Sequence, residues 1–160
     1  MNKYQPEKRS GFTLLELMIA ITIFAVLSAI AIPNMIRWRT NAQFNGAVNI
    51  LRGDLQLAKA VAIRKNCDVS VAFASDGYTV FVDNGSGSGT AGDGTLNGSE
   101  QMLRGRVMPT GLTIGSITFS SSATRFDGKG LCMKTGAVVL SDSINQRTIH
   151  VNRLGRIDIS

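Results

Sequence analysis

The sequence predicts an α+β protein in which one long N-terminal helix packs on an antiparallel β-sheet head. Three observations predict this class. An apolar run begins at residue 12, a helical stripe of apolar side chains follows it, and the apolar period changes from 3.6 to two after Asn66. The 160 residues leave room for one globular head. The net charge of +6 is compatible with anionic partners without requiring them.

The apolar run, residues 12–32, is long enough to span a bilayer as a helix. It contains four polar residues: Thr13, Glu16, Thr22 and Ser28. A lone carboxylate inside a membrane helix costs roughly 2.5–3.5 kcal/mol on insertion scales. The basic residues that precede the run lie in residues 1–11, which we interpret as a leader peptide. Glu16 therefore needs a reason to be there.

Two ordinary interpretations compete for this segment. One is a secretory signal peptide, with Ala-Ile-Ala at residues 29–31 as its cleavage site. The other is a plain membrane anchor, in which Thr13 and Glu16 complete a capping box at the start of the helix. Neither explains why the charged leader stops at Ser10-Gly11 and an aromatic residue, Phe12, opens the run.

The leader MNKYQPEKRSG followed by FTLLELMIAITIFAVLSAIAIPNM resembles the type III signal sequence of type IV pilins and pseudopilins. The resemblance implies that a prepilin peptidase cleaves between Gly11 and Phe12, and that Phe12 is then N-methylated. It implies that Glu16 meets the N-terminal amine of a neighbouring subunit in a filament core, where a buried charge is tolerated because it is paired. Pro33 matches a proline of many type IV pilins, and we expect it to kink the helix.

The same resemblance implies a single-pass protein of the bacterial inner membrane, with its head in the periplasm, that later enters an extracytoplasmic filament. Its partners would be other pilin or pseudopilin subunits, the prepilin peptidase and the inner membrane. The positive-inside count is weak by itself, because basic residues both precede and follow the span.

Residues 33–66 continue the helix as an amphipathic second half, and residues 67–160 form the β-rich head. Apolar residues spaced by four and three indicate a helical face packed on a sheet: Phe44, Val48, Leu51, Leu55, Ala58 and Ala62. Two alternating segments, 67–73 and 78–82, flank the turn signal Ser-Asp-Gly and predict a β-hairpin. Further strands are expected near 101–108, 112–119, 131–140, 146–152 and 156–159.

After the apolar run the chain contains, in order, LQLAKAVAIRKN, DGYTVFVDN, a Gly/Asp-rich loop, EQMLRGR, ITFSSSATRFDGKG and RTIHVNRLGRIDIS. This series resembles the FimT/FimU minor pilins and the related type II secretion pseudopilin GspH. The resemblance implies a structural minor pilin in a priming or tip complex of a pilus-like filament. The alternative is the GspH component of a type II secretion pseudopilus, which serves protein secretion.

A second alternative is a DNA-binding minor pilin for natural transformation, with contacts from Arg153 and Arg156. Some FimT proteins bind DNA through a C-terminal Gly-Arg-x-Arg motif. Here the motif reads Gly155-Arg156-Ile157-Asp158, and the aspartate would repel phosphate. A basic strand edge that resists edge-to-edge pairing explains the same residues.

Cys67 and Cys132 are expected to form a disulfide, since an extracytoplasmic head permits oxidation; two buried thiols are the alternative. Residues 84–99 read as a mobile, solvated loop. Its side-chain oxygens suit calcium in kind, but their spacing fits no calcium loop, so we expect no metal. With one histidine and no nucleophile motif, the sequence predicts neither enzyme activity nor a cofactor.

Overall fold

The computed structural model describes residues 11–87 and 89–160, so the predicted leader lies outside the described residues except for Gly11. The chain forms two compact units, residues 1–40 and residues 41–160, and the helix α1 (Leu14–Lys65) contributes to both. The second unit is the head. Its strands form two four-stranded antiparallel sheets.

The first sheet has the order β3-β2-β1-β5 and the second β4-β6-β7-β8. The strands of the first sheet are β1 (Val69–Ala74), β2 (Gly77–Val82), β3 (Met102–Val107) and β5 (Ala123–Phe126). Those of the second sheet are β4 (Thr113–Ile117), β6 (Gly136–Ser141), β7 (Gln146–Val151) and β8 (Ile157–Ile159). A 3-10 turn, Ser120–Ser122, precedes β5.

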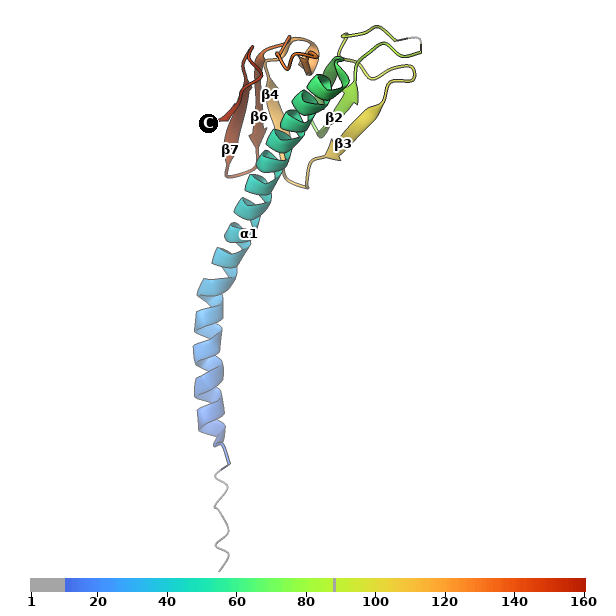
Figure 1. The fold of residues 1–160 in the computed structure, drawn as a ribbon. Helices are drawn as coiled ribbons and strands as arrows, with labels where there is room; N and C mark the ends of the chain where they lie inside the picture. The colour runs from blue at the N-terminus through green and yellow to red at the C-terminus, as the bar shows by residue number, and fades with distance from the viewer. Residues whose placement is uncertain (1–10, 88) are drawn as a thin grey trace, which may run out of the picture. The chain divides into compact units, whose positions relative to one another are not determined.

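The head portion of α1 is amphipathic and ends with a left-handed residue. Figure 1 shows this part of α1, in green, lying across the strands of the head. Asn66 has a φ of 48°, a conformation that asparagine tolerates better than most residues, and it follows the basic pair Arg64 and Lys65 in the last turn. The chain then reverses into β1.

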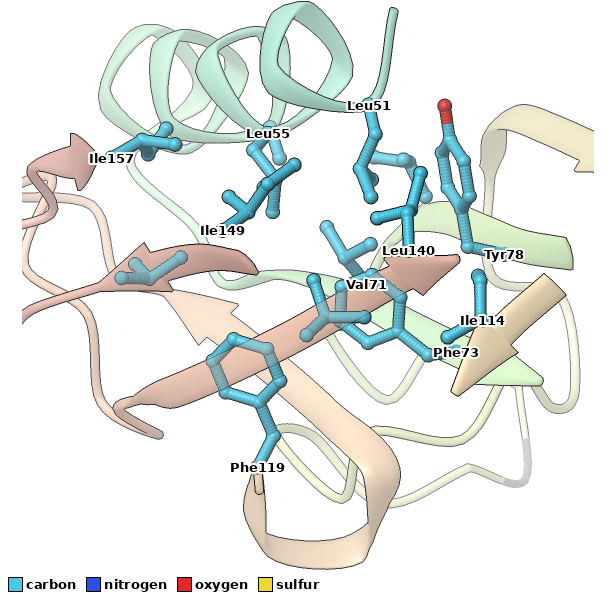
Figure 2. Close-up of a cluster of buried hydrophobic side chains, with 14 of the residues drawn as sticks. Leu51, Leu55, Val71, Phe73, Tyr78, Ile114, Phe119, Leu140, Ile149 and Ile157 are labelled. Carbon is cyan, nitrogen blue, oxygen red and sulfur yellow. The ribbon is translucent and has the colours of Figure 1, made fainter. Parts of the chain in front are cut away.

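One hydrophobic core joins α1 to both sheets. In Figure 2, Leu51 and Leu55 of α1 lie above strand residues such as Val71, Leu140 and Ile149. All five side chains are fully buried. The predicted helical stripe is therefore the core-facing side of α1, and the expected α+β class is confirmed.

The predicted hairpin is also confirmed: β1 and β2 pair from Val69↔Val82 to Ala74↔Gly77. Gly77 is required by close approach, because a Cβ there would lie 2.2 Å from the carbonyl oxygen of Arg106. The turn sequence and the close approach of β3 thus both favour glycine at this position.

Two features of the head differ from the sequence prediction. The four-residue strand β5 was not expected; it is too short for a clear alternation and depends on pairing with the distant β1, from Val69↔Phe126 to Ala72↔Ala123. The strand expected at 131–140 begins only at Gly136, because Cys132 makes a single bridge to Phe126 before the chain crosses to the other sheet.

Candidate functional site

The start of α1 is a capping box. The backbone N–H of Glu16 donates to Thr13 Oγ1 at 3.2 Å, and Glu16 Oε2 accepts from the backbone N–H of Thr13 at 3.0 Å. The Thr13 hydroxyl donates a second hydrogen bond to Glu16 Oε2 at 3.1 Å. This arrangement satisfies orphan donors of the first turn. Oε1 of Glu16 accepts no hydrogen bond from the part of the chain that the structure describes.

The membrane-type part of α1 is exposed along its whole described length. From residue 11 to residue 40 no side chain is buried, and only Ala20 and Thr40 are half-buried. Phe12 is 91% exposed and Trp38 is 69% exposed. The apolar window is long enough to cross a membrane, and none of it is buried. Because water is a poor environment for such a surface, this segment requires lipid or other apolar helices around it.

Pro33 lies inside α1, and the helix continues through it rather than ending there. Pro33 therefore does not divide α1 into two helices in the described chain. Proline has no backbone N–H, so it leaves the carbonyl of Ala29 without its usual helical donor. The expected kink remains a prediction.

The expected disulfide is absent from the structure, where both cysteines are free thiols. Cys132 is buried, and its sulfur lies 3.2 Å from Thr124 Oγ1 and 3.1 Å from the carbonyl oxygen of Lys134. Cys67 is half-buried just after α1, and burial raises the pKa of its thiol. Cys132 therefore packs as a small buried side chain, whereas Cys67 stays partly accessible.

The Gly-rich loop is anchored at both ends by buried carboxylates, so it is more than a solvated linker. Asp83 is fully buried and accepts hydrogen bonds from Ser70 Oγ at 2.5 Å, Gly92 N at 2.6 Å and Gly94 N at 2.9 Å. Glu100 is also buried, and it accepts from two further loop amides. Hydrogen bonds to buried carboxylates therefore hold this loop on the head, as the packing of apolar side chains holds the strands.

The carboxylates considered as calcium ligands have hydrogen-bond partners within the loop. Within residues 11–87 and 89–160, no group of three or more His, Cys, Asp or Glu side chains is placed to hold a metal ion. Asp93 instead accepts hydrogen bonds from Thr95 N at 2.7 Å and Asn97 Nδ2 at 2.9 Å. Its oxygens thus stabilise the loop itself.

Only some of the C-terminal basic side chains have a charged partner in the described chain. Arg156 and Asp158 form an ion pair with 2.8 Å between Nε and Oδ1. Arg153 lies in the exposed turn before them, and Arg147 and His150 are exposed on β7. The aspartate that replaces the second arginine of the Gly-Arg-x-Arg motif thus partly neutralises the first.

A buried polar cluster that sequence reasoning missed links α1 to the first sheet. Asp54 is buried and accepts hydrogen bonds from the Tyr78 hydroxyl at 2.7 Å and from Arg106 Nε at 3.3 Å. Burial, followed by the bond to Asp54, raises the pKa of Tyr78. The sequence position of Asp54 could have revealed this cluster. Asp54 follows Leu51 by three residues and so lies on the apolar stripe of the helix.

An exposed apolar helix with a capped carboxylate, followed by an α+β head, has counterparts among known proteins. Residues 47–155 match the family model described as type II transport protein GspH. The chain belongs to the GspH family. Residues 7–32 match the prokaryotic N-terminal methylation motif, which covers Gly11, Phe12 and Glu16. This GspH family chain is thus a type IV pilin-like protein, as its N-terminal motif predicted.

Named relatives are consistent with this family. The GspH family chain is 40% identical over 52 residues to the type IV major pilin protein PilA of Myxococcus xanthus strain DK1622. The match covers 32% of the chain and only 23% of that relative. Two crystal structures of the type IV minor pilin FimU of Pseudomonas aeruginosa PAO1 share its fold. Their TM-scores are 0.56 and 0.52, at 16% and 18% identity, over 76% and 72% of this chain and 90% and 91% of theirs.

Proposed function

We propose that this protein is a structural minor pilin or pseudopilin of a type IV pilus-like filament. Prepilin peptidase cleaves it between Gly11 and Phe12, and Phe12 is N-methylated. Before assembly, residues 12–32 anchor it in the bacterial inner membrane with the head in the periplasm. After assembly the helix packs in the filament core, and the head makes side contacts in a priming or tip complex.

The observation that supports the proposal best is the position of Glu16 and its hydrogen bonding. It is the only acidic residue in residues 11–40, and it lies on a helix whose side chains are exposed. Within the described chain its capping bonds use Oε2 alone, which leaves Oε1 available to another donor. The N-terminal amine of a neighbouring subunit is a donor of the right charge. Pairing offsets the cost of placing the carboxylate among apolar helices.

Two variants separate the pairing role from the capping role. Glu16→Gln keeps a capping-box residue but removes the charge, whereas Thr13→Val removes the capping hydroxyl and keeps the carboxylate. We expect both to be cleaved and N-methylated at Phe12, as read by the intact mass of the protein from native membranes. Glu16→Gln should reduce incorporation into sheared filaments at least tenfold, because the charge attraction is lost, and Thr13→Val should incorporate like the wild type.

Incorporation of Glu16→Gln at the wild-type level, together with failure of Thr13→Val, would assign the carboxylate to capping alone. A native chain that begins at Ile32 would be incompatible with filament assembly through this helix. It would instead indicate an ordinary secreted domain, since Glu16 would be removed with its signal peptide.

A second candidate is the GspH component of a type II secretion pseudopilus, which the description of the matching family model favours. The structural role of the helix is the same in both machines. Deleting the gene separates them: loss of surface pili with normal protein secretion supports the pilus, and loss of secretion with normal pili supports the pseudopilus.

A further inference from the structure

The surface of the head is more basic than its sequence suggests. Residues 41–160 contain 12 basic and 9 acidic residues. Nine of the basic residues are exposed, but only two of the acidic ones are, Asp76 and Asp158. The reason is that acidic side chains serve as internal acceptors: Asp54, Asp83 and Glu100 are all buried. The head therefore presents excess positive charge to its surroundings.

Part of this charge borders a groove of about 500 Å³ between α1 and the C-terminal segment, which we call the α1–β8 groove. Its lining residues are Arg52, Gln56, Lys59, Ala60, Ile63, Gly155, Arg156, Ile157 and Asp158. The α1 residues Arg52, Gln56, Lys59 and Ile63 are spaced by four, three and four, so they share one helical face. That face is separate from the buried stripe that includes Leu51 and Leu55.

The C-terminal wall of the groove is held in place before any ligand arrives. Asn152 Oδ1 accepts hydrogen bonds from the backbone N–H groups of Leu154 and Arg156, both at 3.0 Å. Gly155 has a φ of 68°, the left-handed region that favours glycine, and it is buried in this turn. Lys59 Nζ donates to the carbonyl oxygens of Leu154 at 3.2 Å and Gly155 at 3.0 Å, which ties the turn to α1.

Two arginines at the groove keep unused donors. The ion pairs of the described chain involve Arg106, Arg125 and Arg156, so Arg52 belongs to none of them. Arg156 uses Nε for Asp158, and its side chain remains 75% exposed. A guanidinium presents five N–H donors that suit carboxylates, so both residues can bind further carboxylate oxygens.

We propose that the α1–β8 groove binds an acidic segment of a neighbouring filament subunit. Carboxylates of that segment pair with Arg52 and Arg156, and its apolar side chains contact Ile63, which is 49% exposed. The basic surface of this chain argues for a different pilin-like protein rather than a second copy, because like charges repel. That the occupant is a filament component rests on the proposed function.

A polypeptide fits the groove better than a nucleic acid. No aromatic side chain lines it, so it offers no platform for stacking bases. Apolar residues between the charged ones, such as Ile63 and Ile157, suit the mixed side chains of a peptide.

The test uses the full chain, purified in detergent, and measures fluorescence anisotropy of a labelled ten-residue oligoglutamate peptide at low salt. Arg52→Gln and Arg156→Gln should each raise the Kd about threefold, and the double variant about tenfold, as expected for exposed ion pairs. Arg147→Gln is the matched control: it removes another exposed charge, on β7, and should leave the Kd unchanged. Thermal unfolding verifies that each variant folds.

Absence of binding, or an equal loss in Arg147→Gln, overturns the site. A ten-nucleotide single-stranded oligonucleotide is titrated in parallel, and tighter binding of it with the same arginine dependence overturns the peptide as occupant. A photo-crosslinker at Gln56 in cells should then join the chain to an acidic pilin-like protein identified by mass spectrometry, and one at Gln146 should not. Because peptide binding needs no filament, its failure is distinguishable from failure of Glu16→Gln incorporation.

Discussion

Replacing Asp83 by alanine should destabilise the head by about 3 kcal/mol. The carboxylate accepts three hydrogen bonds, and two of their donors, Ser70 Oγ and Gly94 N, belong to buried residues, whereas Gly92 is half-buried. A buried donor left without a partner costs about 1–3 kcal/mol. Because water can reach part of the loop, we take the lower end of that range for each donor. For a head of this size the loss corresponds to a fall in Tm of roughly 10 °C.

Asp83→Asn should cost only about 1 kcal/mol, because the amide oxygen can replace Oδ2 and only the contact with Gly92 N becomes unfavourable. Asp76→Asn makes the same chemical change at an exposed turn and should fall within about 0.5 kcal/mol of the wild type. The assay is thermal and denaturant unfolding of the full chain in detergent, followed by near-UV circular dichroism. If Asp83→Ala unfolds at the wild-type midpoint, the buried carboxylate does not anchor the loop.

Two further predictions concern titration and thiols. In a Tyr4→Phe variant, where Tyr78 is the only tyrosine, absorbance at 295 nm should rise only above the ordinary tyrosine pKa of about 10, because burial and the bond to Asp54 raise the pKa of Tyr78. The stability that its protonated hydroxyl contributes is complete below the unfolded pKa and is lost as pH rises through the folded one, and native titration near pH 10 would refute this. Denatured, non-reduced protein should show two thiols, whereas in the native protein Cys132 should be protected and Cys67 should react slowly; a count of zero would mean that they are bonded.

The sequence by itself was sufficient for the features that depend on neighbouring residues. The 21-residue apolar run from Phe12 to Ile32 requires an apolar environment in any helical arrangement, and the family match of residues 7–32 confirms the N-terminal motif. The apolar stripe of α1 and the hairpin around Ser75-Asp76 were predicted because helix and strand periods repeat over a few residues. The capping box was visible in the same way.

The tertiary structure alone decided how distant segments share polar groups. Asp83 meets Gly92 and Gly94 because the loop folds back on it, and the buried Asp54 of α1 finds its donor in Tyr78 of β2. The short strand β5 exists only because β1 is there to pair with it. These contacts join residues far apart in the chain, and their free energy depends on burial that no local pattern records. For the same reason, the sequence gives the net charge of the head, but it does not show that most of the acidic side chains are shielded and that the surface is basic.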